Sequence, residues 1–387
     1  MLKTSGTQKN SKPSATRRWE ELKGFLMKRI SRRTFIKSAA FLGAAAASPL
    51  IFIPKAQASW ARKTPVHPNV DNLRVVGVTD PQMIRGLEPS CDWSRQDELV
   101  APKVVSENMD RLACALAGTN KPEEAWSAIF VKPPGKAWSD VVVAVKTNHI
   151  ARQHARSAVI AGVCRALTDR IGVKGANIHI YDACHGSSME RDTPFKGLPE
   201  GTRIEGTWGG SNTPTSVPKP WSDSEDSTCI KHLVSGSVDI LVNVALCKGH
   251  SSTFGGFTMT MKNHFGTFSP SPGHQSGAED YLLAINQTPE ILGTMDQRTG
   301  RVLFPRQQLC IVDALWASKH GPGGHPSHQT NSVFMGVMSP VMDYLLATRF
   351  RGEKMGWGYQ MEATHRMLTE FGFSENDLPN GGKIIEI

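Results

Sequence analysis

The sequence predicts an α/β protein with a mostly parallel sheet and helices on both faces, formed by one mature domain with loop insertions. Short, continuously apolar runs alternate with segments of helical period, and such runs are typical of strands that are covered on both faces. A chain of 387 residues is long enough to bury a sizeable core. The mature chain shows no internal repeat that would indicate a solenoid or a propeller.

Six apolar or β-branched runs are the predicted strands. They lie at residues 73–80, 141–148, 176–183, 238–246, 308–315 and 332–338. The clearest is VVVAVKTN at 141–148, because a continuous β-branched run favours a strand that is buried on both faces.

Apolar residues at helical spacing predict the helices. The segment 104–118 carries Val105, Met109 and Leu112 on one face and stops at a glycine. Further helices are predicted over 155–171, 278–286, 341–349 and 359–371. The segment 184–229 shows neither the apolar period of a helix nor that of a strand. Its length favours a functional insertion or a lid.

Residues 1–58 predict an export signal. Arg32 and Arg33 precede an apolar segment of 15 residues, 39–53, and Ala56-Gln57-Ala58 fits a small-x-small cleavage site. This segment is shorter than the ~20 residues of a membrane span, which disfavours the alternative of an uncleaved anchor. We expect a twin-arginine signal that is cleaved near Ala58, with either Met1 or Met27 as the start.

This prediction has consequences for location and organisation. The twin-arginine translocase would be a partner during export, and the mature protein would be periplasmic. A polar linker is predicted over 59–72, and a single α/β domain over 73–387.

The positive charge of the chain belongs to the leader. The formal net charge is +9, but residues 1–58 hold 12 of the 44 Lys and Arg and 2 of the 35 Asp and Glu. The rest of the chain therefore keeps 32 basic and 33 acidic residues. This balance gives no reason to expect nucleic acid as a partner.

The seven cysteines form no CxxC pair and no ferredoxin-type run, so a self-contained iron–sulfur cluster is not expected. Cys114 and Cys164 fall within apolar helical patterns and are predicted to be buried thiols. Cys91 and Cys229 lie in predicted loops and are the disulfide candidates.

Polar and cationic residues gather where the predicted strands end. They are Lys146 and Asn148, Asp182, Cys247, Lys248 and His250, Asp313, and Ser339. Because the carboxyl ends of parallel strands meet at one edge of a sheet, we expect a shared site there. Helix capping would also explain an aspartate at such a position. It does not explain a lysine, whose charge opposes the dipole of a following helix.

Lysines and histidines in this arrangement suit a small anionic substrate or cofactor. The candidate anion-binding residues are Lys146, Asn148, Lys248, Lys262 and Asn263. The candidate catalytic residues are His250 and His264, which would move protons, and Asp313, which would orient a histidine or bind a metal.

A second cluster, KHGPGGHPSH, offers His320, His325 and His328 as ligands of a transition metal, with Cys184 and Cys247 as further candidates. The spacing matches no zinc motif, so an exposed loop with incidental histidines is the alternative. The identity of any cofactor is open from the sequence.

Four of these segments together resemble the bacterial and archaeal family called domain of unknown function 362. The segments are VVAVKTN, IHIYDA, DILVNVALCKGH…MTMKNHFGTF and CIVDALWASKHGPGG. The family's K-x-N, N-x-x-x-x-K-x-H, K-N-x-F-G and V-D-(A/G)…G-P-x-G patterns fall on Lys146/Asn148, Asn243/Lys248/His250, Lys262/Asn263/Phe265/Gly266 and Asp313/Gly321/Pro322.

A later D-P-x-x-x-D pattern of the family is matched at Asp343, whereas Ser339 stands at its first aspartate. The resemblance spans roughly residues 73–373 and implies no activity. Some family members carry ferredoxin-like cysteine motifs that this chain lacks, so the resemblance does not imply electron transfer through clusters of its own.

Two functions are compatible with these observations. The first is an exported enzyme of redox or isomerase type that binds a small anion at the carboxyl edge of the sheet. The second is a non-catalytic metal-binding protein, or an assembly or maturation protein for an exported redox complex, which would then be a partner.

Overall fold

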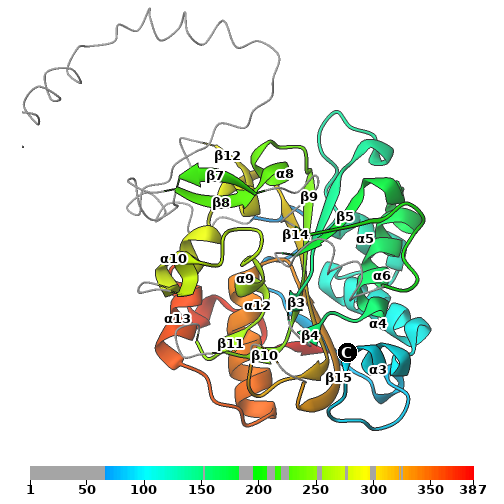
Figure 1. The fold of residues 1–387 in the computed structure, drawn as a ribbon, viewed down its shortest axis with the longest axis vertical. Coiled ribbons are helices and arrows are strands. Elements are labelled where there is room, and N and C mark those ends of the chain that lie inside the picture. Colours follow the sequence, from blue (N-terminus) through cyan, green and yellow to red (C-terminus); the bar gives the residue numbers. More distant parts are fainter. Residues whose placement is uncertain are drawn as a thin grey trace, which may run out of the picture. The chain divides into compact units, whose positions relative to one another are not determined.

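The computed structural model describes residues 66–150, 153–182, 195–206, 214–218, 226–250, 255–274, 278–296, 302–321, 323 and 326–387. These residues form an eight-stranded sheet with helices on both faces, which confirms the predicted class (Figure 1). They belong to one compact unit of the chain, Ser48–Ile387. The predicted export signal, Cys184 and His325 lie outside the described residues.

The strands of the main sheet lie in the order β16–β1–β15–β14–β9–β2–β5–β6. Their bounds are β1 (Val76–Thr79), β2 (Val143–Lys146), β5 (Ile178–Asp182), β6 (Arg203–Gly206), β9 (Ile240–Leu246), β14 (Gln307–Ala317), β15 (His328–Gly336) and β16 (Ile385–Glu386). Neighbouring strands of this sheet are parallel except at β15, which is antiparallel to both β1 and β14.

The direction of β15 corrects one prediction. Ser339 follows β15 and therefore lies at the opposite edge of the sheet from Lys146 and Lys248, not with them. The physical reason is the connection from β14 to β15, residues 318–327, which is too short for a helical crossover and joins the two strands as a hairpin.

One face of the sheet is covered by α3 (Trp93–Leu99), α4 (Pro102–Ala117), α5 (Pro122–Ile129) and α6 (Ser157–Arg165) (Figure 1). The strand residues Val145, Val242 and Ile311 pack into this layer. As predicted, α4 ends at Gly118, and the helix that α6 begins continues to Ile171 and ends at a glycine. Gly118 has φ 72°, the left-handed conformation that favours glycine at a helix end.

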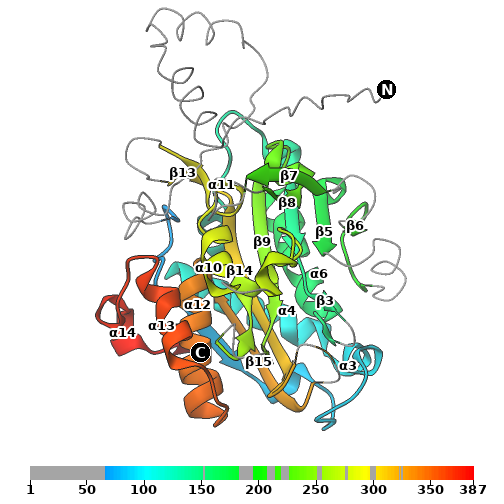
Figure 2. The same cartoon turned by 60° about the vertical axis from the view of Figure 1, so that its left-hand side comes forward.

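The other face is covered by α9 (Thr260–Asn263), α10 (Ala278–Ile285), α12 (Ser339–Leu345) and α13 (Met361–Thr369) (Figure 2). The α12 helix continues as a wider π-helix to Lys354. Ala144, Ala245 and Val312 pack toward this side. Side chains alternate along a strand, so Lys146 shares this second face with Ala144, whereas Asp313 shares the first face with Ile311.

Shorter elements complete the described fold. The small helices include α8 (Lys231–Val234), α11 (Pro289–Leu292) and α14 (Pro379–Gly382). Two-stranded hairpins are formed by β3 (His149–Ile150) with β4 (Gln153–His154), β7 (Pro214–Pro218) with β8 (Asp226–Ile230), β10 (Lys248–Gly249) with β11 (Phe257–Thr258), and β12 (Gly293–Met295) with β13 (Val302–Pro305).

The segment 184–229 contains strands that the sequence did not reveal. Its β6 extends the main sheet beside β5, and β7 and β8 form a hairpin. These runs are short and contain Gly, Pro and Ser, which hides the period of a strand. Residues 195–202 of the segment are also described, whereas 184–194, 207–213 and 219–225 lie outside the described residues.

All six described cysteines are free thiols, so the prediction that Cys91 and Cys229 form disulfides is wrong. Cys164 is buried as predicted, whereas Cys114 is only half-buried. Val70, in the second half of the predicted linker, packs into the core. Among the described residues, no helix combines the length and the apolarity that crossing a membrane requires.

Candidate functional site

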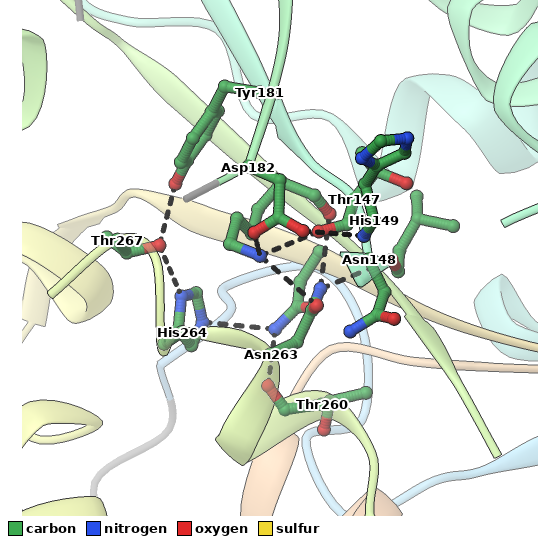
Figure 3. A network of polar contacts seen from close by, with 12 residues as sticks. Thr147, Asn148, His149, Tyr181, Asp182, Thr260, Asn263, His264 and Thr267 are labelled. Carbon is green, nitrogen blue, oxygen red and sulfur yellow. Dashed lines mark hydrogen bonds and ion pairs between the residues drawn. The ribbon is translucent and has the colours of Figure 1, made fainter. Parts of the chain in front are cut away.

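The base of the site is an ion pair between the ends of two adjacent parallel strands. Lys146 ends β2 and Asp182 ends β5, and the Lys146 Nζ donates to the Asp182 Oδ1 at 2.7 Å. The same ammonium donates to the Thr147 carbonyl at 2.6 Å and to the Asn263 Oδ1 at 3.2 Å. The other Asp182 oxygen accepts the backbone N–H of His149 (Figure 3). The positive charge of Lys146 is therefore balanced by groups of the protein itself.

Asn263 joins α9 to the strands beneath it (Figure 3). Its side-chain amide donates to the Asn243 Oδ1 at 2.8 Å and to the backbone carbonyls of Val244 at 3.2 Å and Lys146 at 3.3 Å. Because these acceptors lie on β9 and β2, the one side chain ties the short helix to two strands of the sheet.

His264 lies on the face of the sheet, at the amino end of β14. Its Nε2 is 2.7 Å from the Gln307 Oε1 and 3.0 Å from the Asn243 Nδ2, and its Nδ1 is 3.1 Å from the Thr267 Oγ1. Thr267 in turn contacts the Tyr181 hydroxyl at 2.8 Å (Figure 3). Burial lowers the pKa of His264 to about 3, so its ring is neutral at ordinary pH.

Asp343, which appeared in the sequence analysis only as part of a family pattern, fixes the start of α9. Its Oδ1 accepts the backbone N–H and the hydroxyl of Thr260, and its Oδ2 accepts the N–H of Met261 at 2.9 Å. A helix of four residues cannot satisfy its first N–H groups internally, and this buried carboxyl does so. Burial nevertheless raises the pKa of Asp343 to about 7. Asp343 thereby positions Lys262 and Asn263.

Lys248 lies on the hairpin β10–β11, directly after β9. It is 1% exposed, and its Nζ donates to the Asn148 Oδ1 at 2.8 Å. Among the described residues, no carboxylate lies within ion-pair distance of this ammonium. Burial, with smaller contributions from the charges of Lys262 and Lys146, lowers the pKa of Lys248 to about 7, while Asp182 opposes the shift.

His250 and Lys262 meet at the same edge. The Lys262 ammonium contacts the His250 Nε2, and it also lies 5.1 Å from the centre of the Phe265 ring. Burial and the charge of Lys262 lower the pKa of His250 to about 3, and burial lowers the pKa of Lys262 to about 7. His274, which the sequence analysis missed, lies with its ring centre 6.4 Å from that of His250. We call Lys248, His250 and Lys262 the edge cluster.

Close backbone packing explains two glycines near the edge cluster. A Cβ on Gly249 would lie 2.3 Å from the Lys319 carbonyl oxygen, and one on Gly321 would lie 2.0 Å from the Gly249 oxygen. Only glycine permits this approach of the hairpin to the loop after β14. Gly255 and Gly256 have φ of 76° and 86°, in the left-handed region that favours glycine.

Asp313 lies apart from the histidines to which it was assigned. Its Oδ2 accepts the backbone N–H of Arg156 at 2.8 Å and contacts its guanidinium at 3.5 Å, and its Oδ1 accepts the N–H of Leu315. In the described structure these partners include no histidine. Asp313 points to the first face of the sheet, whereas His264 packs on the second. Arg156, a buried partner that the sequence analysis missed, also donates to Gln96 at 2.7 Å.

The predicted metal ligands are dispersed where the structure describes them. His320 is exposed, and His328 packs its ring 4.9 Å from that of Trp357. Cys247 is buried 4.0 Å from the Arg351 guanidinium, and burial raises the pKa of its thiol. The described residues include no group of three or more His, Cys, Asp or Glu side chains that could hold a metal. The metal site stays a prediction, because Cys184 and His325 lie outside those residues.

The structure stacks a pair of histidines that the sequence did not bring together. His149 and His154 face each other across the β3–β4 hairpin with ring centres 3.8 Å apart. Their five-residue spacing does not bring them together on a helix, but the register of a tight hairpin does. Alternation around a two-residue turn was the signal that could have found them.

The geometry defines the class of protein: an α/β sheet whose parallel strands end in a buried, predominantly cationic site. A family model described as Domain of unknown function (DUF362) matches residues 143–347, which is more than half of the chain, and the chain belongs to this family. The match runs from just before Lys146 to just beyond Asp343 and is narrower than the predicted span of 73–373. No curated protein and no solved structure matches the chain.

Proposed function

We propose that the protein binds a small anion, as substrate or cofactor, between Lys248 and Lys262 at the carboxyl end of β9. Lys248 carries this proposal, because its ammonium is buried with Asn148 as its hydrogen-bond partner and no counter-ion among the described residues. A buried charge without a counter-ion is costly. A bound anion would remove that cost.

The surroundings of Lys146 differ from those of Lys248. That lysine has Asp182 at 2.7 Å as its counter-ion, so its charge is already balanced. The anion would therefore face Lys248 and Lys262, while Lys146 and Asn263 hold the scaffold and Asn148 orients Lys248. Phosphate- and carboxylate-type ligands suit such lysines.

His250 is the proposed proton-transfer group. Its Nε2 faces the Lys262 ammonium, so a proton can pass between the two groups when a ligand changes their charges. A redox or isomerase reaction is the proposed class. Export through the twin-arginine translocase, a periplasmic location and an exported redox partner belong to the same proposal and rest on residues 1–58.

Anion binding is tested by calorimetry on the purified full chain at pH 6.5, with sulfate, malonate and acetate as probes. Lys248→Met and Lys262→Met should each weaken binding about 10- to 100-fold, the value of one charged hydrogen bond. Lys103→Met is the matched control, because the Lys103 side chain is 90% exposed, and its binding should be unchanged.

The proposal fails if the wild-type chain binds none of the three anions, or if both variants bind as tightly as the control. Circular dichroism of each variant separates loss of binding from loss of fold. Metal analysis of the same preparation tests the alternative of a metal-binding protein.

A further inference from the structure

The hairpin β10–β11 has one apolar side and one polar side. Phe257 packs into the core, and Gly249 lies against the loop after β14. Lys248 stands directly opposite Thr258 in the register of the hairpin. Directly opposed residues of antiparallel strands project to the same side. His250 is two residues beyond Lys248 and shares that side by alternation.

Two groups on this polar side have unmet hydrogen-bonding capacity. Thr258 is 4% exposed, and its hydroxyl has no hydrogen-bond partner in the structure. Buried hydroxyls without a partner are rare, because burial removes the hydrogen bonds that the hydroxyl makes with water. The ammonium of Lys248 has three donors, of which the contact with Asn148 uses one.

We propose that Thr258 binds the ligand together with Lys248, and that this ligand is a small oxyanion. The inference rests on the proposed function, since it adds a residue and a ligand class to the same site. An ammonium can only donate, so the ligand atoms that face it must be acceptors, and the oxygens of sulfate-, phosphate- or dicarboxylate-type groups meet this requirement.

The hydroxyl of Thr258 adds a neutral donor on the same side of the hairpin as Lys248 and fixes the orientation of one ligand oxygen.

Thr258→Val tests this assignment, because valine keeps the shape and removes the hydroxyl. Without ligand, the melting temperature should stay the same or rise, since no hydrogen bond is lost. Affinity for sulfate or malonate should fall about 3- to 10-fold, the value of one neutral hydrogen bond. Thr258→Ser keeps the hydroxyl and should restore binding.

Thr348→Val is the matched control. Its hydroxyl donates to the Tyr344 carbonyl at 2.8 Å, so this variant should lose stability while its sulfate affinity stays unchanged. The opposite pattern in the two variants separates a ligand-binding hydroxyl from a structural one.

The outcomes also separate this inference from the proposed function. If the wild-type chain binds no anion, both are overturned. If it binds sulfate or malonate and Thr258→Val binds equally well, the assignment of Thr258 is overturned and the anion site stands. Preference for sulfate supports a tetrahedral group, and preference for malonate supports a dicarboxylate.

Discussion

His250 and His264 come from one stretch of sequence, and burial lowers the pKa of both to about 3, yet their surroundings differ. His264 lies on the face of the sheet, where Gln307, Asn243 and Thr267 contact both ring nitrogens. The ring of His250 faces the ammonium of Lys262 at the edge of the sheet. A lowered pKa therefore does not distinguish a structural histidine from one that is proposed to transfer protons, but the chemistry of the partner does.

The lysines show the same contrast between the two regions. Lys146, in the network on the sheet face, has Asp182 as a counter-ion, whereas Lys248, in the edge cluster, is buried beside a neutral amide. The network has the partners that stabilise a fold. In the edge cluster, the buried ammonium of Lys248 has no counter-ion among the described residues, which is the usual state of a binding site before its ligand arrives.

The largest expected effect comes from breaking the hydrogen-bond network on the face of the sheet. Asn263→Ala removes three donated hydrogen bonds and one accepted from Lys146, and should lower the free energy of unfolding by about 3 kcal/mol. Urea denaturation measures it. Asn177→Ala, which removes one bond to the Ser139 carbonyl near the surface, should cost about 1 kcal/mol. Equal losses in the two variants would contradict a structural role for the network.

The next largest effect is an increase in stability, and it comes from a substitution in the edge cluster. Lys248→Met should raise the free energy of unfolding of the ligand-free protein by about 1 kcal/mol or more at pH 6, because it removes a buried charge. With the folded pKa lowered from 10.5 to about 7, the penalty is complete below pH 7 and disappears as the pH rises toward 10.5.

The difference in stability between Lys248→Met and wild type should therefore shrink from pH 6 to pH 10, whereas the difference between Lys103→Met and wild type should show no such trend. Thermal denaturation over this pH range measures both. A destabilised Lys248→Met at pH 6 would show that the protein itself compensates the lysine.

The smallest effect distinguishes the two histidines directly. Bound sulfate should raise the pKa of His250, because the anion offsets the charge of Lys262 that helps to lower it. His264, which is surrounded by neutral partners and lies away from the edge, should not respond. NMR of the ring protons between pH 5 and 7.5, with His250→Gln for assignment, measures both. A response of both rings, or of neither, would contradict the separation of the two regions.

Local patterns were sufficient for much of the fold. Val105, Met109 and Leu112 predicted the buried face of α4, and Gly118 and Gly172 predicted where two helices end. These features depend on residues within a few positions of each other, so the sequence alone carries them. The short β6 and the β7–β8 hairpin were missed, because their stability comes from pairing with distant strands and not from their own composition.

The sequence by itself determined the α/β class, the family resemblance and the gathering of lysines and histidines where parallel strands end. The tertiary structure decided which of these charges are compensated. The pairing of β15 moved Ser339 to the other edge, side-chain alternation separated Asp313 from His264, and the packing of α12 brought Asp343 to the start of α9. Compensation of a buried charge depends on register and packing between segments far apart in the chain, and the local pattern of residues does not contain that information.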